Sequence, residues 1–350
     1  MATWRKQSLV TLAGMRTRLH RRRFLVFAGA AAGSAILAAC GGSTATDTPK
    51  PAVPTTAAPT TAAPTTAAAS AAAGTGGLQT MVVEAFDFGF KTMGSIPGGL
   101  TRVQLQNTGK EGHHAQFMLL NPGVSPEQIG AAFQKGAEEA FKFASFVGGP
   151  GAIVPGGAAE VLLNLKEGQY MLACIITGAD NIPHLAKGMV LPLKVSAPAT
   201  AAPAPQVNGT INMVDFNYEM PATLPVGKSM WRITNTGAQF HELAVWQLMP
   251  GKTVDDFTKF FDAPRTASPS GPPPALPMGG MQALTRGNEG ILALDLKGGD
   301  YVATCFIPDQ SKPNGDSHLH LGMIKGFHRQ VRRRSVSGCC AGGASSSPAS

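Results

Sequence analysis

The sequence predicts an all-β protein with two tandem domains, each a Greek-key β-sandwich or small barrel that carries a short helix insertion. Three observations lead to this prediction: short strand-like segments between glycine and proline turns, an internal repeat, and a helix-start signal at the same place in each repeat. Short strands with regular turns at this domain size are typical of β-sandwiches and small barrels. At 350 residues the chain is long enough for two such domains.

The internal repeat is visible as residues that recur at a constant spacing. The Asn-Thr-Gly triplet at 107–109 returns at 235–237, an offset of 128, and an Asp-Phe pair and a Pro-Gly pair return at the same offset. The offset grows to 134 by the end of the copies, which indicates insertions in the second one. The chain is therefore predicted to hold two copies of one domain, 78–197 and 207–327, joined by an Ala/Pro linker at 198–206.

Six segments of the first copy show apolar alternation or short β-branched runs bounded by Gly, Pro or Asn. We predict strands at 81–86, 100–106, 115–120, 158–165, 169–176 and 189–195. A helix is predicted to begin after Ser125, because Ser125 and Gln128 have the spacing of a capping box and Pro126 occupies the first helical position. Thr253 and Asp256 mark the matching helix of the second copy.

The N-terminal segment, residues 1–40, has the features of an export signal. A basic region containing Arg21 and Arg22 precedes an apolar stretch of small residues that ends at Cys40. The run Arg-Arg-x-Phe-Leu resembles the twin-arginine motif, and Leu-Ala-Ala-Cys resembles a bacterial lipobox, which implies cleavage before Cys40 and lipidation of its thiol. An ordinary signal peptide with a chance cysteine is the alternative. Residues 41–77 consist largely of Ala, Thr and Pro and are predicted to form a disordered tether.

The excess of basic residues lies at the two ends of the chain. Seven of the Lys and Arg residues fall in 1–40 and four in 327–350, and neither segment holds an acid. The remaining 18 basic and 21 acidic residues leave the body mildly acidic, so nucleic-acid binding is not expected. Residues 328–350 have neither periodicity nor an apolar face, and we predict a disordered tail there.

Each copy contains a single cysteine, Cys174 or Cys305, so a framework of disulfides within the domains is not expected. A bridge between these two residues is an alternative, and it would join equivalent positions of the two repeats. Cys339 and Cys340 are adjacent and lack nearby ligands, so no role is assigned to them.

Each copy brings the same three candidate metal ligands together at the end of an apolar, strand-like run. A Cys, a His and a Met follow one another in both copies: Cys174, His184 and Met189, then Cys305, His318 and Met323. Thiolate, imidazole and thioether are ligands that copper favours, and a trigonal His₂Cys site with a weak axial Met is the blue-copper arrangement. Taken singly, such residues are more often core cysteine and methionine or solvated histidine. Their recurrence in both copies favours a metal site that needs one more histidine.

That histidine lies in the turn after the Asn-Thr-Gly triplet. His113 follows the triplet at 107–109, and His241 follows the one at 235–237 with the same spacing. An Asn-Thr-Gly turn with a nearby His, then a distant Cys, His and Met, resembles the cupredoxin (blue-copper) family over both repeats. The resemblance implies a His from a loop between strands, a Cys that ends a strand, and a His and Met on the loop after it.

Carried over residue by residue, the resemblance implies one type 1 copper ion per domain. The two ligand sets are His113, Cys174, His184 and Met189 in the first copy, and His241, Cys305, His318 and Met323 in the second. His320 also lies in the second loop, and the spacing favours His318 as the ligand. His114 follows His113 where the second copy has Glu242, and we expect His114 to lie at the surface. Zinc is the alternative metal, but Met is a poor zinc ligand and structural zinc sites hold more thiolate.

The resemblance implies an electron carrier that exchanges single electrons with redox proteins of the cell envelope. The lipobox-like motif at Cys40 implies that this carrier is lipid-anchored at the extracytoplasmic face of the cell membrane. A two-domain copper oxidase or nitrite reductase is the alternative. Such enzymes need a further copper cluster, whose motifs include a His just before the blue-site Cys, and here that position holds Ala173 or Thr304. We therefore expect the chain not to be an enzyme, although a cluster at a subunit interface could use His114 or His320. A copper-delivery protein without a redox role is the third hypothesis and shares the same ligands.

Overall fold

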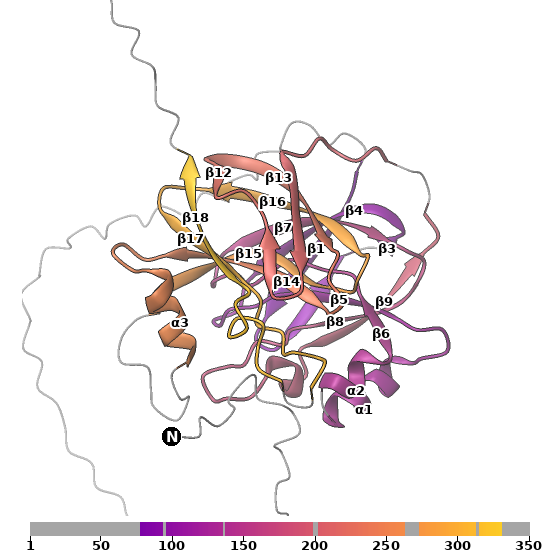
Figure 1. Cartoon of the computed structure of the whole chain (residues 1–350). Helices are drawn as coiled ribbons and strands as arrows, with labels where there is room; N and C mark the ends of the chain where they lie inside the picture. Colours follow the sequence, from indigo (N-terminus) through magenta and orange to yellow (C-terminus); the bar gives the residue numbers. More distant parts are fainter. Residues whose placement is uncertain are drawn as a thin grey trace, which may run out of the picture. The chain divides into compact units, whose positions relative to one another are not determined.

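The structure, a computed structural model, describes residues 78–93, 96–135, 137–198, 202–262, 273–312 and 315–330. The predicted signal segment, the tether, the lipidation site Cys40 and residues 331–350 of the predicted tail lie outside these ranges. Within them the chain is mostly β-strand, which confirms the prediction of an all-β sandwich fold (Figure 1). None of the helices in these ranges has the length and apolarity needed to cross a membrane.

The first copy consists mainly of strands. They are β1 (Gln79–Phe86), β2 (Gly89–Thr92), β3 (Ile96–Pro97), β4 (Gly99–Asn107), β5 (Gln116–Leu120), β6 (Ala144–Phe146), β7 (Ala158–Leu165), β8 (Gly168–Ala173) and β9 (Val190–Ser196). Two helices, α1 (Pro126–Lys135) and α2 (Ala137–Phe141), separate β5 from β6. All six predicted strands are present, with ends shifted by at most three residues. The strands β2, β3 and β6 escape prediction because each has four residues or fewer, too few to show a period.

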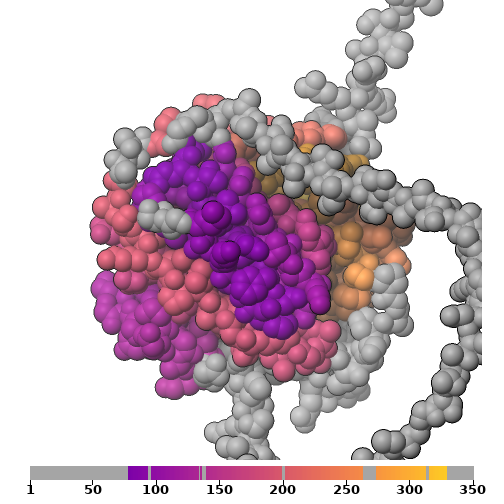
Figure 2. Space-filling model, turned by 180° about the vertical axis from the view of Figure 1, so that it is seen from behind, coloured from indigo at the N-terminus to yellow at the C-terminus, as the bar shows by residue number. Residues whose placement is uncertain are grey.

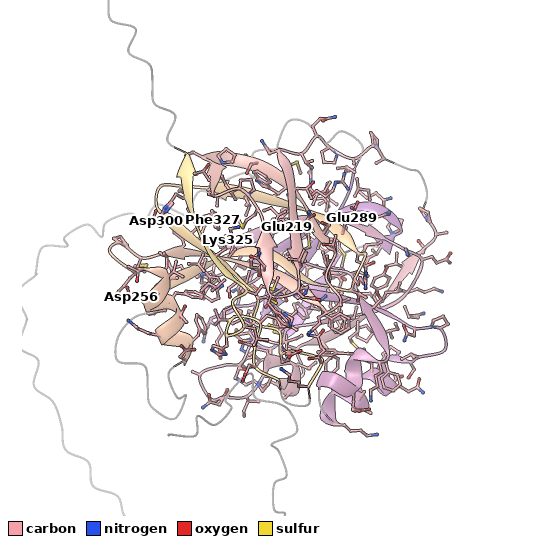
Figure 3. The ribbon with its side chains drawn as sticks, in the orientation of Figure 1. Glu219, Asp256, Glu289, Asp300, Lys325 and Phe327 are labelled. Carbon is pink, nitrogen blue, oxygen red and sulfur yellow. The ribbon has the colours of Figure 1, made fainter. Side chains whose placement is uncertain are left out.

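The second copy repeats this order. Its elements are β10 (Gly209–Val214), β11 (Asn217–Glu219), β12 (Thr223–Pro225), β13 (Gly227–Asn235), β14 (His241–Leu248), α3 (Val254–Asp262), β15 (Ala275–Leu284), β16 (Glu289–Leu296), β17 (Asp300–Thr304) and β18 (Ile324–Gln330). The strand β18 continues three residues beyond the end predicted at 327, because its last residues pair with β12 and β17. Figure 3 shows Lys325 and Phe327 on this strand beside Asp300 of β17. The other predicted domain boundaries stay predictions.

The strands form two five-stranded sheets and one eight-stranded sheet. The five-stranded sheets have the orders β3-β9-β8-β5-β6 in the first copy and β12-β18-β17-β14-β15 in the second. The eight-stranded sheet has the order β11-β10-β13-β16-β7-β4-β1-β2, so both copies contribute to it and β16 pairs with β7 at its centre. Each copy is therefore a sandwich of its own sheet and its half of the shared one. Seen from behind, indigo residues of the first copy and orange residues of the second form one continuous surface (Figure 2).

Both helices with a predicted start signal begin where the sequence places them. The hydroxyl of Ser125 accepts the Gln128 amide at 3.3 Å, and the Gln128 side chain accepts the Ser125 amide at 2.7 Å. Thr253 and Asp256, the latter labelled in Figure 3, form the same reciprocal pair at the start of α3. Each helix then buries an apolar face against the five-stranded sheet of its own copy.

The two copies meet with an approximate two-fold relationship. Residues 147–153 of the first copy pair antiparallel with the equivalent residues 278–284 of the second, and we call this pairing the central ribbon. Its hydrogen bonds come in matched pairs, in which the partners of one bond are the repeat equivalents of the partners of the other. In the first pair, the amide of Gly148 donates to the carbonyl of Ala283 at 2.9 Å and the amide of Gly279 donates to the carbonyl of Ala152 at 2.8 Å. In the second pair, the amide of Gly151 donates to the carbonyl of Gly280 and the amide of Gln282 to the carbonyl of Gly149, both at 2.9 Å. Exchanging the copies therefore reproduces the same bonds, as expected for a two-fold contact.

The central ribbon also positions the first histidine of each copy. His113 exchanges two backbone hydrogen bonds with Ile153, of 3.1 and 3.2 Å, at one end of the ribbon. His241, at the start of β14, pairs with Leu284 at the other end. The central ribbon, which joins the two copies, thus also positions the two loop histidines.

Candidate metal centres

The structure brings His113, Cys174 and His184 together in the interior of the first copy. The Nδ1 atoms of the two histidines are 3.1 Å apart. The sulfur of Cys174 lies 3.5 Å from Nδ1 of His184 and 4.0 Å from Nδ1 of His113. All three side chains are fully buried. We call this group centre 1.

His241, Cys305 and His318 form the same arrangement in the second copy, which we call centre 2. The histidine Nδ1 atoms are 3.0 Å apart, and the sulfur of Cys305 lies 3.4 Å from Nδ1 of His318. In each centre the candidate ligand atoms all lie within 4.8 Å of one another. Cys174 and Cys305 are both free thiols, so the alternative of a bridge between the copies is not realised.

The Asn-Thr-Gly turn holds each loop histidine in place. The side-chain amide of Asn107 donates to the carbonyl of Glu111 at 2.8 Å and to a carbonyl of the central ribbon at 3.1 Å, while its oxygen accepts the amide of Gly109. Asn235 makes the equivalent three bonds in the second copy. A Cβ added at Gly109 would lie 2.6 Å from Nε2 of His113, so the turn requires a glycine there.

In centre 1, carboxylates on the outer ring nitrogens determine the tautomers of both histidines. An oxygen of Asp87 lies 2.7 Å from Nε2 of His113, and an oxygen of Glu111 lies 3.0 Å from Nε2 of His184. A carboxylate only accepts, so each Nε2 carries the proton and each Nδ1 presents a lone pair to the interior. Burial lowers the pKa of His184 more than Glu111 raises it, so this imidazole is neutral.

Centre 2 has the same tautomers with one different partner. Asp215 lies 2.9 Å from Nε2 of His241, and the side-chain oxygen of Gln239 lies 3.1 Å from Nε2 of His318. Burial lowers the pKa of His241, and burial together with the neighbouring His241 lowers the pKa of His318 to about 4. Both imidazoles are therefore neutral at pH 7.

The converging lone pairs show that the residues fit a bound metal ion. In each centre two Nδ1 lone pairs face each other at 3.0 or 3.1 Å with a thiol beside them. Two facing lone pairs repel each other, and a cation held by these two histidines and the cysteine would relieve that repulsion. One thiolate with two neutral imidazoles is also a donor set that soft or borderline metals accept.

Backbone amides support the sulfur in both centres. The amides of His114 and Ile176 donate to Cys174, and those of Glu242 and Ile307 donate to Cys305. Burial nevertheless raises the pKa of Cys174 to about 12 and raises that of Cys305 well above its ordinary value. Metal binding at either centre therefore releases a proton from the thiol.

The two candidate axial methionines lie next to these ligands through backbone hydrogen bonds. The amide of Met189 donates to the carbonyl of His184 at 3.0 Å, and its carbonyl accepts the amide of Cys174 at 3.2 Å. The equivalent distances for Met323, to His318 and Cys305, are 2.7 and 3.2 Å. Both methionine side chains are fully buried. Their role as metal ligands stays a prediction.

His318 and His320, the two candidate histidines of the second loop, lie in different surroundings. His318 contributes to centre 2, whereas His320 is exposed and pairs with Asp262 of α3 at 2.6 Å. The other ring nitrogen of His320 lies 3.1 Å from the hydroxyl of Ser317. The structure therefore places His318, as the spacing predicted, among the candidate ligands.

The expectation that His114 lies at the surface is wrong. Only 7% of this residue is exposed, and its Nε2 accepts the amide of Ile175 at 2.8 Å. The equivalent Glu242, 8% exposed, accepts the amide of Phe306 at 2.9 Å. Both side chains thus bind the residue that follows the cysteine. Burial lowers the pKa of His114 to about 3 and raises the pKa of Glu242 to about 7.

The residues that bond the outer ring nitrogens of the four histidines were not predicted from the sequence. A signal existed for Asp87 and Asp215, because the Asp-Phe pair recurs at the offset of the repeat. The Phe of each pair also packs edge-on against the second histidine, with ring centroids 4.9 Å apart in centre 1 and 5.1 Å in centre 2. Glu111 and Gln239 gave no signal, because the two copies differ there.

Comparisons with known proteins found similarity only among solved structures; no family model and no curated protein matches the chain. Auracyanin from Roseiflexus castenholzii is 20% identical over 35% of this chain and 96% of its own, with a TM-score of 0.25. A multicopper oxidase is 14% identical over 72% of this chain and 89% of its own, with a TM-score of 0.21. A copper-containing nitrite reductase from Thermus scotoductus is 12% identical over 72% of this chain and 61% of its own, with a TM-score of 0.20.

These findings correct one expectation. We expected the chain not to be an enzyme, because Ala173 and Thr304 occupy the position of a cluster-binding histidine. The similar structures include a multicopper oxidase and a copper nitrite reductase, and each match covers 72% of the chain, more than one copy. Absence of one histidine motif is therefore not a sufficient reason to exclude an enzyme, and the expectation is withdrawn.

The fold and the donor sets agree with the resemblance found in the sequence. Each copy is a β-sandwich, and each brings a loop His, a Cys after the end of a strand and a second His together, with a Met beside them. The chain thus has a tandem β-sandwich fold, and each copy carries one His, Cys and His group that could hold a metal ion.

Proposed function

We propose that centre 1 and centre 2 each bind one type 1 copper ion, and that the protein passes single electrons to and from redox proteins of the cell envelope. Copper, when bound, supplies a one-electron couple between Cu(II) and Cu(I). Electron uptake at such a centre is a step that carrier proteins and copper enzymes have in common.

The donor geometry is the observation that supports this proposal most directly. Two imidazoles bring their Nδ1 atoms to within 3.0–3.1 Å of each other, with a buried thiol within 3.4–3.5 Å of the second imidazole, and this occurs in both copies. One Cys with two His and a neighbouring Met suits copper better than zinc, whose structural sites carry more thiolate.

Hydrogen bonds and packing contacts surround these donors in both centres. The outer nitrogens of all four histidines are hydrogen-bonded, and the sulfurs accept backbone amides. The rings of Phe88 and Phe216 pack against the second histidine of each centre. A buried donor set with such support moves little when an electron arrives, which favours electron transfer over ligand exchange.

Copper loading of the full chain tests the proposal. The expected results are one copper ion bound per centre, an intense thiolate-to-copper band in the visible spectrum, and reversible uptake of one electron per copper. Cys174→Ser and Cys305→Ser should each remove about half of the band, because each leaves one Cys-containing centre. The double variant should be colourless.

Cys339→Ser is the matched control, since it removes a cysteine outside both centres and should leave the band unchanged. A full chain that binds copper without a thiolate band, or a band that survives in the double cysteine variant, would contradict the assignment of the ligands.

We propose further that the protein acts outside the cytoplasmic membrane and is anchored there by a lipid on Cys40. The support is the sequence motif, since Cys40 lies outside the described residues. Cys40→Ala should shift the protein from the membrane fraction to the soluble fraction of the cell envelope, and mass spectrometry should show loss of the lipid. A variant that stays in the membrane fraction would contradict the anchor.

A further inference from the structure

The directions of the strands place the two centres at opposite ends of the eight-stranded sheet. Each Asn-Thr-Gly turn, with the histidine that it holds, follows one strand of this sheet: β4 in the first copy and β13 in the second. β4 connects to β13 through β7 and β16, and all three pairings are antiparallel. Three reversals leave β4 and β13 running in opposite directions. The two turns therefore lie at opposite ends of the sheet.

The register of these strands gives the separation of the two turns. The three pairings place Gln104 of β4 and Met230 of β13 on one line across the sheet. From this line β4 runs three residues to Asn107, and β13 runs five residues the other way to Asn235. At about 3.3 Å per residue, the turns are about 26 Å apart along the strand direction.

The central ribbon gives a second estimate of the separation. His113 bonds to Ile153 at one end of the ribbon, and His241 pairs with Leu284 at the other end. Ile153 bridges to Met278, which is six residues from Leu284 along the ribbon. Six residues of extended chain span about 20 Å. Both estimates therefore place the two loop histidines about 20 Å or more apart.

Centre 1 reaches the surface through a group of charged side chains at its own end of the sheet. The outer nitrogen of His184 lies 3.0 Å from Glu111, whose side chain is 37% exposed. Asp180 and Lys187 form an ion pair of 2.9 Å beside it. A Cβ added at Gly178 would lie within 3.0 Å of atoms of all three side chains, so they converge there. We call Glu111, Asp180 and Lys187 patch 1.

Centre 2 reaches the surface at the opposite end through a different group. The outer nitrogen of His318 lies 3.1 Å from the side-chain oxygen of Gln239, and the amide of that side chain donates to Asp309 at 2.8 Å. Asp309 in turn pairs with the exposed Lys312 at 3.5 Å. We call Gln239, Asp309 and Lys312 patch 2. The two patches share no residue, so each centre has its own connection to solvent.

The separation of the patches is large enough for two protein partners. A stable protein–protein interface covers about 800 Å² on each partner, which is a disc about 32 Å across. Two such discs centred about 26 Å apart would overlap on one face of a protein. The patches lie at opposite ends of the sheet, so partners docked over them do not compete for surface.

We propose that patch 1 and patch 2 are separate docking sites for one-electron redox proteins, so that one chain holds two such partners at the same time. A reduced partner loses one electron, the copper bound at the centre beneath its patch gains that electron, and no covalent bond forms or breaks. The reverse step returns the electron to an oxidised partner. This inference rests on the proposed function and adds to it a two-ended geometry and a stoichiometry.

A polymer attached at one patch tests whether that patch serves one centre only. Asp180→Cys and Lys312→Cys each place a thiol at one patch, where the native side chains are 49% and 73% exposed. The full chain also carries Cys40→Ala, Cys339→Ser and Cys340→Ser, so that a polyethylene glycol maleimide reacts only there once copper is loaded. Oxidation of reduced cytochrome c, a small basic one-electron carrier suited to the mildly acidic body, is followed by stopped-flow absorbance.

The two single-centre proteins should respond in opposite ways. With Cys305→Ser, which leaves centre 1, polymer at patch 1 should slow oxidation of cytochrome c at least about tenfold, and polymer at patch 2 should change it less than about twofold. With Cys174→Ser, which leaves centre 2, the pattern should reverse. The same proteins without polymer are the matched controls. Ascorbate, which is small, should reduce all of them at similar rates, which shows that the polymer blocks docking and does not damage the centre.

Two further measurements do not depend on electron transfer. Zinc-substituted cytochrome c, which is redox-inactive, should bind the copper-loaded chain with two molecules per chain in analytical ultracentrifugation at low salt. Polymer at either patch should reduce this number to one. Pulsed electron paramagnetic resonance of the chain with both centres loaded should give a distance of about 20–30 Å between the two Cu(II) ions.

Several results would overturn the proposal. Polymer at one patch that slows both centres alike would show a common docking face, and polymer that slows neither would place docking elsewhere. A limit of one cytochrome c per chain, or a distance between the copper ions well below about 20 Å, would also contradict it. If these occur in proteins that show the thiolate band, the electron-transfer function stands and only the two docking sites fail. Proteins without the band refute both proposals.

Discussion

The buried carboxyl of Glu242 should make the metal-free protein less stable as the pH rises. Burial raises the pKa of this group from an ordinary 4.5 to about 7. Between these pH values the folded protein retains a proton that the unfolded chain has released, so the free energy of unfolding falls as pH increases. A pKa difference of about 2.5 at about 1.4 kcal/mol per unit corresponds to about 3 kcal/mol, lost in full above about pH 7.

Glu242→Gln removes the titrating proton and keeps an oxygen that can accept the amide of Phe306. We expect the variant to match the wild type near pH 4 and to be more stable by about 3 kcal/mol near pH 8. Urea unfolding of the metal-free protein with a chelator present, followed by tryptophan fluorescence, measures both free energies. Glu219→Gln, which removes an exposed acid and keeps Glu242, is the control and should lose stability with rising pH as the wild type does.

Two outcomes would refute this account of Glu242. One is an equal free energy of unfolding for variant and wild type near pH 8. The other is a gain of the same size near pH 4, which would mean that packing and not charge separates the two side chains.

Three further predictions follow from the same structure. His114 should act in the opposite direction, because burial lowers its pKa from 6.5 to about 3 and the folded protein then resists a proton that the unfolded chain binds. The wild type should lose stability as pH falls through this range, and His114→Gln should lose less in the same urea assay, since the other buried histidines remain. Gly280→Ala should lower the free energy of unfolding in urea by more than about 3 kcal/mol, because its φ is 128° and a Cβ there would overlap a backbone oxygen of β14. Gly287→Ala, with open space around its Cβ, is the control and should lower it by about 1 kcal/mol. Equal losses in the two variants would contradict this account. Asp215→Ala removes the acceptor that holds the tautomer of His241 and should weaken copper binding at centre 2 by about 10–100-fold in a chelator competition, and an unchanged affinity would contradict that role.

The fold class and the ligand clusters could be predicted because their signals are local or repeated. The strand alternation, the capping boxes at Ser125 and Thr253 and the recurring His, Cys, His and Met each appear twice in the sequence. Repetition separates them from chance occurrences of the same residue types. The structure confirms the strands and both helix starts, and it brings six of the eight candidate ligands together in two groups.

The remaining features depend on contacts between distant segments. Nothing in the local sequence shows that β7 pairs with β16, or that residues 147–153 pair with their own repeat equivalents. The burial of His114 is of this kind, since it follows from a hydrogen bond to Ile175, distant in sequence, and not from any local period. The sequence around His114 therefore predicted a surface position, which is wrong.

The two-fold relationship between the copies has a consequence for how the centres could diverge. In an assembly of two identical chains, every substitution enters both sites at once, and the pair His114 and Glu242 could not coexist. A single chain that contains both halves removes this constraint, while the matched hydrogen bonds of the central ribbon keep the halves in register. Fusion of the halves therefore allows one molecule to hold two unlike sites in an almost symmetric scaffold.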